Sequence, residues 1–309
     1  MSDLFNVSSG PHIRSKYTTQ KIMGIVILAL LPTTIYGIVH FGIKAAVLVV
    51  SGIVTCVITE LIYDLIMKKP ITVGDLSAVV TGLLLALNMP PNAGWWMPVI
   101  GGIFAIVFVK MLFGGLGQNF MNPALAGRCF LVICFTAEMT DFGYDGITGA
   151  TPLAMIRNNE AVSVKDMILG NIPGTIGETS LVAIVLGACI MLAFGVIDLK
   201  IPLTYIISFV IFMGLFAGRG WNVDYLLAQV AGGGLMLGAF FMATDYATSP
   251  ITSGGKIVYG IALGIMTGIF RCFSSSAEGV SFAIVFCNLL VPIIETLTLP
   301  KCFGKGGEA

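Results

Sequence analysis

Long apolar stretches joined by short polar connectors make up most of the chain. A helix needs roughly 20 predominantly apolar residues to cross about 30 Å of hydrocarbon, and stretches of about that length recur ten times. They lie at approximately 21–40, 44–67, 75–89, 95–113, 121–136, 179–197, 201–217, 225–243, 256–271 and 279–297, and the third and fifth are the short ones. The stretches are apolar on every face, without the alternation of barrel strands, which favours membrane-spanning α-helices.

The composition agrees with this pattern and excludes several classes of protein. Of 309 residues, 57% are hydrophobic and 10% are charged, whereas soluble domains carry about 25% charged residues. There are 16 basic residues (Lys and Arg) and 16 acidic residues (Asp and Glu), so no excess of basic residues is available to bind nucleic acid. These figures exclude a soluble globular protein, a disordered chain and a nucleic-acid-binding protein. The expected fold is an all-α polytopic membrane protein with about ten transmembrane helices in lipid.

The distribution of Lys and Arg predicts the orientation of the chain in the membrane. Ten of the sixteen fall on one side of the predicted spans: Arg14, Lys16, Lys21, Lys68, Lys69, Lys110, Lys200, Lys256, Lys301 and Lys305. The other side holds Lys44, Arg157, Lys165, Arg219 and Arg271, and Arg128 lies near the start of a span. Because cytoplasmic loops are the positive ones, we expect both termini to be cytoplasmic. The first apolar stretch is too long for a signal peptide and is interpreted as a retained span.

One long segment separates two sets of five predicted spans. Residues 137–178 form a loop on the predicted outer face, with six acidic residues against two basic ones. Weak similarities between the halves, such as 81–91 with 238–246, favour a five-plus-five inverted repeat, because an odd number of spans per half reverses the orientation. The predicted division is a cytoplasmic segment 1–20, a membrane half 21–136, the outer loop 137–178, a second half 179–297 and a cytoplasmic tail 298–309.

Little of the chain suits acid–base, metal or nucleotide chemistry. His12 and His40 lie near opposite membrane faces, and a lone surface histidine is more often solvated than a ligand. The seven cysteines include no C-x-x-C pair. No Walker loop occurs, and no glycine-rich motif stands between a strand and a helix. We therefore expect no catalytic residue and no metal site in this chain.

The most specific signal lies in the outer loop, in Asp145-Gly-Ile-Thr-Gly-Ala-Thr151-Pro-Leu. The simplest interpretation is a turn, because Asp-Gly and Thr-Gly favour turns and Pro152 moves Thr151 away from helical geometry. The stretch also resembles D-x-x-S/T-G-A-T, the flavinylation motif of the family that contains the D subunit of Rnf complexes and the B subunit of sodium-pumping NADH:quinone reductases. In that family a flavin transferase joins FMN, through its phosphate, to the last threonine hydroxyl. The resemblance implies a covalent FMN on Thr151. The other motif positions are Asp145, Thr148, Gly149 and Ala150.

The resemblance extends over nearly the whole chain. Residues 9–19, 117–124, 242–250 and 277–284 also resemble segments of this family. The length favours the D subunit of Rnf complexes over the quinone-reductase B subunit, which carries a longer N-terminal extension. The resemblance implies a flavoprotein subunit of an ion-translocating ferredoxin:NAD⁺ oxidoreductase in a prokaryotic cytoplasmic (inner) membrane, with electron transfer coupled to translocation of Na⁺ or H⁺.

Such a protein would not be active alone. The implied partners are the other Rnf subunits, namely further membrane subunits, the flavin-carrying G subunit, and the iron–sulfur and NAD-binding subunits, with a flavin transferase for maturation. Two alternatives stay open at this point. One is a protein like the B subunit of a Na⁺-translocating NADH:quinone reductase. The other is a solute transporter like a urea channel, because fold alone does not fix function.

A second flavin site is implied around Asn119 and Asn122. Asn122 followed by Pro123 is a helix-start signal, with the asparagine as N-cap and the proline in the first turn. That signal leaves Asn119 unexplained. In the related reductase the matching pair holds riboflavin, and amide side chains suit the polar edge of an isoalloxazine ring. The resemblance thus implies a non-covalent flavin near the cytoplasmic face. Arg128 could meet an anionic flavin there, or it could equally pair with a carboxylate.

Ionisable groups in or beside membrane spans are candidates for ion translocation. Glu60 and Asp64 are four residues apart, and Lys68 follows on the same helical face, so an ion pair at the cytoplasmic end is the simplest interpretation. Asp75 and Asp245 stand at span ends, where each could cap a helix or lie at the interface. The candidates for cation translocation are Glu60, Asp75 and Asp245.

Overall fold

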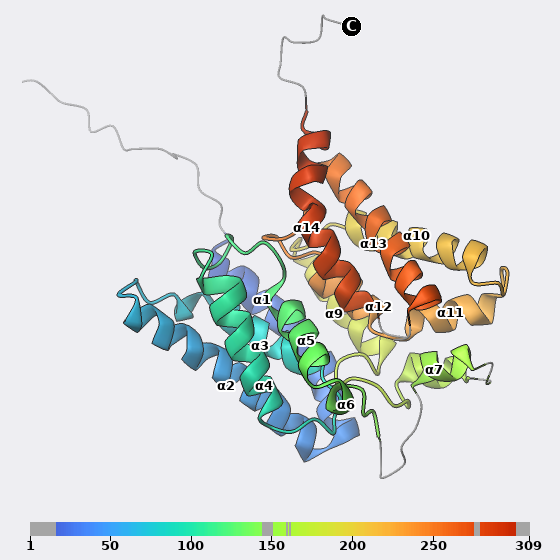
Figure 1. Ribbon diagram of the computed structural model, residues 1–309, viewed down its shortest axis with the longest axis horizontal. Helices are drawn as coiled ribbons and strands as arrows, with labels where there is room; N and C mark the ends of the chain where they lie inside the picture. Colours follow the sequence, from blue (N-terminus) through green and yellow to red (C-terminus); the bar gives the residue numbers. More distant parts are fainter. Residues whose placement is uncertain (1–16, 144–150, 159, 161, 275–278, 301–309) are drawn as a thin grey trace, which may run out of the picture.

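The computed structural model describes residues 17–143, 151–158, 160, 162–274 and 279–300, and within these ranges it contains helices and no strand (Figure 1). The first half comprises α1 (Thr19–Phe41), α2 (Ile43–Ile66), η1 (Val73–Asp75), α3 (Ser77–Leu87), α4 (Met97–Phe104), η2 (Ala105–Met111) and α5 (Pro123–Cys134). The connecting segment carries α6 (Thr136–Met139), α7 (Pro152–Arg157) and α8 (Val164–Leu169). The second half comprises α9 (Leu181–Ala193), α10 (Lys200–Phe216), α11 (Val223–Ala231), α12 (Leu235–Leu237), η3 (Gly238–Met242), α13 (Ser253–Phe273) and α14 (Val280–Thr298).

The expected class, an all-α membrane protein, is confirmed, and each predicted apolar stretch contains a helix. Among the described residues, four helices are long and apolar enough to cross a bilayer, namely α1, α2, α13 and α14. A fifth span results if α11 and the segment Leu235–Met242 are taken together, although they are bent by 61° at a break. Five shorter apolar helices account for the other predicted stretches. The count of ten spans therefore stays a prediction.

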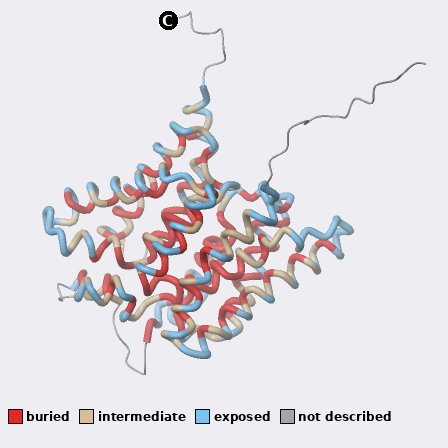
Figure 2. Tube along the Cα trace, turned by 180° about the vertical axis from the view of Figure 1, so that it is seen from behind, coloured by how far each residue is buried: buried red, intermediate tan, exposed pale blue. Residues whose placement is uncertain are grey.

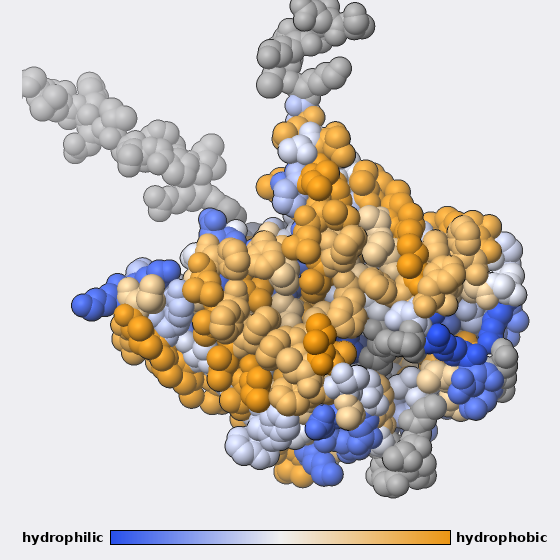
Figure 3. All heavy atoms as spheres, viewed as in Figure 1, coloured by the Kyte–Doolittle hydropathy of each residue, from blue (hydrophilic) through white to orange (hydrophobic). Residues whose placement is uncertain are grey.

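The face of the molecule drawn in Figure 3 is largely apolar, as contact with lipid requires. Hydrophobic side chains cover the centre of the face seen in Figure 3, and hydrophilic ones gather at its margins. Ile43 and Leu297 are 82% and 80% exposed. Soluble monomers rarely expose contiguous apolar patches of this kind. The buried residues lie inside, largely where the two halves meet (Figure 2).

The two halves lie side by side, with α1–α5 coloured blue to green and α9–α14 coloured yellow to red in Figure 1. Helix α1 packs against α9, where the Gly187 Cα faces the Ala29 carbonyl oxygen so closely that a side chain would clash. Helix α5 packs against α14. The first predicted span thus meets the sixth, and the fifth meets the tenth. A two-fold relation between the halves would produce this pairing, and the inverted repeat stays a prediction.

The segment predicted as an outer loop contributes both surface and core. Helices α7 and α8 pack against α11. Farther along, residues 175–180 are all buried. The Ile176 N–H donates to the Met89 carbonyl at 3.1 Å, and the Gly177 N–H donates to the Leu87 carbonyl at 2.7 Å. These bonds satisfy carbonyls at the end of α3, which have no water partner inside the membrane. The end of this segment therefore joins the first half to the second.

The eighth predicted span is broken at residues 232–234. Gly233 and Gly234 have φ values of 65° and 67°, a left-handed conformation that glycine adopts readily. The buried Arg271 of α13 donates to the carbonyls of Gly232 and Gly233 at 2.9 and 3.2 Å, and to Gln229. A broken helix within a membrane needs such partners for its freed carbonyls. Arg271, which the sequence suggested as an outer-face charge, is thus a structural partner of the break.

Candidate functional site

A pocket of about 750 Å³ lies between the two halves and collects several of the predicted site residues. Its lining comes from α1, α3, η2, α5, α9 and η3 and the turns beside them. Asn119, Asn122 and Asp245 are all on its wall. Most of the remaining lining is apolar, including Leu84 and Phe241. Ligand sites for small molecules typically combine an apolar wall with a few convergent polar groups in this way.

The two asparagines differ in their own hydrogen bonds. Asn122 is the N-cap of α5, as the Asn-Pro signal predicted: its Oδ1 accepts from the N–H groups of Ala124 and Leu125 at 3.0 and 3.3 Å. Its Nδ2 donates to the Met242 carbonyl at 3.4 Å. Asn119 donates to the Met121 carbonyl at 3.2 Å, but its buried Oδ1 has no partner among the described residues. A buried acceptor without a donor costs about 1–3 kcal/mol, so Asn119 is suited to receive a hydrogen bond from a ligand.

Asp245 closes the turn that follows η3 and is half-buried at the edge of the same pocket. Burial raises the pKa of its carboxyl, and hydrogen bonds from the Ala247 N–H and the Thr248 hydroxyl partly oppose the rise. The Thr248 hydroxyl donates at 3.1 Å. Asp245 therefore serves as a turn residue locally, and among the residues described it is also the one carboxylate on the pocket wall.

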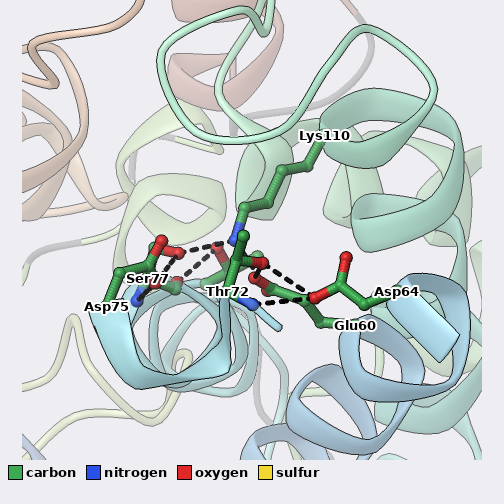
Figure 4. Close-up of polar contacts among 7 residues, drawn as sticks. Glu60, Asp64, Thr72, Asp75, Ser77 and Lys110 are labelled. Atoms are coloured by element: carbon green, nitrogen blue, oxygen red, sulfur yellow. Dashed lines mark hydrogen bonds and ion pairs between the residues drawn. The ribbon is translucent and has the colours of Figure 1, made fainter. Parts of the chain in front are cut away.

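Glu60 and Asp64 of α2 form part of a buried polar cluster (Figure 4). The predicted ion pair of these carboxylates with Lys68 is wrong. Helix α2 ends at Ile66, and Lys68 has a left-handed conformation with φ 53°, so its side chain leaves the helical face that the spacing assumed. Instead, the Thr72 hydroxyl lies 2.7 Å from Glu60 Oε1 and 3.0 Å from Asp64 Oδ2. The Thr72 N–H also donates to Asp64 Oδ2, at 2.9 Å.

The partner of Glu60 is Lys110, 2.6 Å away between Nζ and Oε2. Lys110 had been placed on the cytoplasmic face by its charge, yet it is buried, with 2% of its surface exposed. It lies in the π-helical turn η2, a distortion that is frequent at functional sites. Its Nζ also donates to the Ser77 hydroxyl at 2.5 Å. Lys110 and Ser77 both line the pocket that holds the asparagines, so the pocket and the cluster adjoin.

Asp75 completes the cluster from the turn before α3. Its Oδ1 accepts from the Ser77 N–H at 2.8 Å and from the Ser77 hydroxyl at 2.5 Å. The carboxylate thus caps the first residue of α3, as one interpretation of the sequence had it. Leu76, between the two, has φ 65°. A left-handed conformation at a branched residue is unusual, and here it folds the Asp75 side chain back onto Ser77.

Arg128 of α5 is not on the pocket wall but lies against α14 and the connecting segment. It donates to the Ser281 hydroxyl of α14, and its Nη1 lies 4.0 Å from Glu178 Oε1. Both Arg128 and Glu178 are buried. The sequence left open whether Arg128 meets an anionic flavin or a carboxylate, and the structure places a carboxylate beside it. Glu178 belongs to the buried end of the connecting segment, so the pair links that segment to both halves.

Thr151 stands at the start of α7, and the other motif residues, Asp145, Thr148, Gly149 and Ala150, lie outside the described residues. Its backbone is extended, with φ −60° and ψ 153°, as the following Pro152 predicted. Its Oγ1 accepts from the Ala154 N–H at 3.4 Å, which leaves the hydroxyl hydrogen available. The side chain borders a second pocket of about 310 Å³, next to Gly232 and Gly233 at the break in the eighth span.

Sequence reasoning missed several residues of these sites. Thr72 and Ser77 carried no signal, because hydroxyl residues at span ends are common. Lys110 was visible as an intramembrane charge, and its position near the end of an apolar stretch hid its burial. Glu178 was visible only as one of several acidic residues in a long loop.

Comparison with known proteins identifies the family. The NQR2, RnfD, RnfE family matches residues 6–304. The chain is 44% identical to the D subunit of the Na(+)-translocating ferredoxin:NAD(+) oxidoreductase complex of Acetobacterium woodii, over 96% of this chain and 95% of that protein. It is 36% identical to the D subunit of the proton-translocating ferredoxin:NAD(+) oxidoreductase complex of Clostridium ljungdahlii, over 98% and 97%. It is 30% identical to the D subunit of the ion-translocating oxidoreductase complex of Escherichia fergusonii, over 97% and 99%. The chain therefore belongs to the NQR2, RnfD, RnfE family.

Proposed function

We propose that this chain is the membrane flavoprotein D subunit of an ion-translocating ferredoxin:NAD⁺ oxidoreductase complex, with FMN attached to Thr151. Near-full-length similarity to three D subunits of such complexes supports the role. The observation that carries the FMN proposal is the position of Thr151: a half-buried hydroxyl at the start of α7, beside a small hollow that Gly232 and Gly233 also line.

The residues around Thr151 suit attachment of a phosphate. Among the described residues, the hydroxyl accepts one long hydrogen bond, from the Ala154 N–H in the first turn of α7, and its own hydrogen is available. By the resemblance, Asp145, Thr148, Gly149 and Ala150 are the other positions of the flavinylation motif. FMN held there would supply the electron-transfer chemistry, for which this chain provides attachment and surroundings.

We also propose that the pocket between the halves holds a second, non-covalent flavin such as riboflavin. The pocket is lined mostly by apolar side chains, and those of Leu84 and Phe241 suit a flat ring. The unpartnered Oδ1 of Asn119 fits a ring N–H group. Asn122 would add its Nδ2, which makes one long hydrogen bond of 3.4 Å.

Cation translocation would use the acidic residues near this pocket. Two relatives belong to complexes that translocate different ions, Na⁺ in one and protons in the other, so kinship leaves the ion open. We propose roles for Glu60, Asp75 and Asp245, which lie in the polar cluster or on the pocket wall. The termini would lie on the cytoplasmic side of the inner membrane and the FMN segment on the outer side. Other subunits would provide the iron–sulfur centres and the ferredoxin and NAD sites.

In-gel fluorescence tests the FMN proposal. The full chain, co-expressed with a flavin transferase and denatured, should give a fluorescent band under ultraviolet light, because only covalent flavin survives denaturation. Thr151→Val should remove the fluorescence and Thr151→Ser should retain some of it. The control is Thr140→Val in the same segment, whose hydroxyl donates to the Thr136 carbonyl. Fluorescence that persists in Thr151→Val, or a wild type that never fluoresces, would contradict the proposal.

A further inference from the structure

Six side chains form one continuous line of hydrogen bonds at the cytoplasmic end predicted for the first half (Figure 4). The line begins at Asp75, which accepts from the Ser77 hydroxyl. Ser77 accepts from Lys110, and Lys110 is paired with Glu60. The Thr72 hydroxyl then lies between Glu60 and Asp64. Every link is 3.0 Å or shorter.

The formal charges in this line do not balance. Glu60, Asp64 and Asp75 would carry three negative charges, and Lys110 carries the one positive charge. Glu60 and Asp64 are both fully buried. Removing an uncompensated charge from water is costly, so buried acids neutralise instead. Other titratable groups nearby are the Cys56 thiol of α2, and Tyr63, Lys68 and Lys69 near the end of that helix. The two lysines are exposed, so their compensation is screened by water.

The hydroxyl of Thr72 also has fewer hydrogens than its contacts with the two carboxylates require. A threonine hydroxyl has one hydrogen to donate, yet its oxygen lies within 3.0 Å of a Glu60 oxygen and an Asp64 oxygen. If both carboxylates were ionised, one of these contacts would be between two acceptors. In addition, Asp64 Oδ1 is buried and has no partner among the described residues. An ionised Asp64 would place part of its negative charge on that buried atom without a donor to stabilise it, which is unfavourable.

We propose that this site stores one exchangeable proton, shared by Glu60 and Asp64 through the Thr72 hydroxyl. With the proton on Glu60, its O–H donates to Thr72 Oγ1, and Thr72 donates to Asp64. When the Thr72 hydrogen passes to Asp64 and the Glu60 proton passes to Thr72, the proton has moved and no atom is gained or lost. Oxygen–oxygen distances of 2.7 and 3.0 Å suit shared hydrogens. The hydroxyl thus occupies the position that a metal ion between the carboxylates would need.

The stored proton deepens the cation role proposed for Glu60 and Asp75, and only its use in translocation rests on that role. Infrared spectroscopy of the full chain in its purified, resting complex tests the proton without electron transfer. At neutral pH the spectrum should contain the carbonyl stretch of a buried protonated carboxylic acid. The band should shift in D₂O, and it should respond to ¹³C labelling of aspartate or glutamate carboxyl groups. This arm requires no substitution, so it does not depend on a variant folding.

Variants then assign the band. Asp64→Asn should remove it or shift it to glutamic acid frequencies, and Thr72→Val should shift it because the shared hydroxyl is lost. Lys110→Met should add a second protonated carboxyl, since a positive charge has been removed from the line. The control is Asp224→Asn, which changes an exposed carboxylate at the start of α11. Covalent FMN fluorescence and complex assembly report whether each variant is folded.

Three outcomes would overturn the stored proton. One is a resting complex without a protonated-carboxyl band at neutral pH. Another is a band that survives unchanged in Asp64→Asn and in Glu60→Gln, since the proton would then lie elsewhere. The third is a band that disappears at constant pH when K⁺ is replaced by Na⁺, which would make the site a sodium site. Loss of fluorescence in Thr151→Val bears only on the FMN proposal, so the two failures are distinguishable.

Discussion

Asn119 and Asn122 are three residues apart, but their side-chain amides make different hydrogen bonds. Asn122 holds the first turn of α5 and is explained by helix capping, which a sequence motif can predict. Asn119 donates one hydrogen bond, and its buried Oδ1 has no partner among the described residues. Local propensity gives no reason for a buried amide at that position. The residue that capping rules do not explain is therefore the better candidate for contact with a ligand.

We expect Asn119→Ala to release the non-covalent flavin while leaving stability nearly unchanged. Flavin extracted from the undenatured complex should fall several-fold, whereas covalent fluorescence should stay. Asn122→Ala should also destabilise the fold by about 1 kcal/mol through loss of the N-cap. Asn222→Ala is the matched control, because Asn222 caps α11 with the same pair of backbone hydrogen bonds and does not line the pocket. Full flavin retention in Asn119→Ala would exclude the proposed contact.

Residue partners were the hardest feature to predict from the sequence. The spacing of Glu60, Asp64 and Lys68 fitted an ion pair only for a helix that continued through Lys68. The helix ends at Ile66, and the partner of Glu60 comes from 50 residues away. The count of positive charges placed Lys110 on the cytoplasmic face. Its burial was not predicted, because periodicity does not reveal which face of a span meets another span. For Glu60 and for Lys110 alike, burial between helices determined which partner the side chain contacts.

At the level of elements, apolar stretches predicted the positions of helices well, because the cost of unsatisfied backbone groups in lipid leaves few other structures. Breaks inside the stretches were not predicted. The eighth stretch reads as one span, yet it is bent by 61° around Gly232–Gly234. The glycines were visible in the sequence, but Arg271, which stabilises the break, and Glu178, which packs against Gly234, come from distant segments.

Gly234→Ala should destabilise the protein and disturb the pocket beside Thr151. The backbone there is left-handed, and an added Cβ would overlap the Glu178 carboxylate, which is buried next to Arg128. Strain alone costs about 1–3 kcal/mol, and the overlap adds to it. Gly195→Ala separates the two effects, because Gly195 has φ 65° and nothing within 4 Å of the added atom. Thermal unfolding in detergent should show the larger fall in Tm for Gly234→Ala; equal falls would rule out the steric contribution.

At the scale of the whole molecule, the site between α1–α5 and α9–α14 was predictable only in part. Motifs indicated Asn119 and Asn122, and position in the chain indicated Asp245, but nothing in the sequence placed these residues on one wall. Their proximity depends on how α1, α3 and η3 pack, which pairwise spacing along the chain does not encode. The same packing sets Lys110 on both the pocket and the polar cluster.

Because the cluster adjoins the pocket, a change at Glu60 should separate electron transfer from cation movement. In proteoliposomes containing the full complex, Glu60→Gln should lose most of its cation translocation per electron while ferredoxin-dependent NAD⁺ reduction continues. The reason is that the amide keeps the size of Glu60 but removes its exchangeable charge beside Lys110. Asp75→Asn should act in the same direction, through the Ser77 link. Asp224→Asn, an exposed position, should translocate like wild type. Running each assay with and without Na⁺ identifies the ion, and unchanged translocation in both cluster variants would remove the cluster from the path.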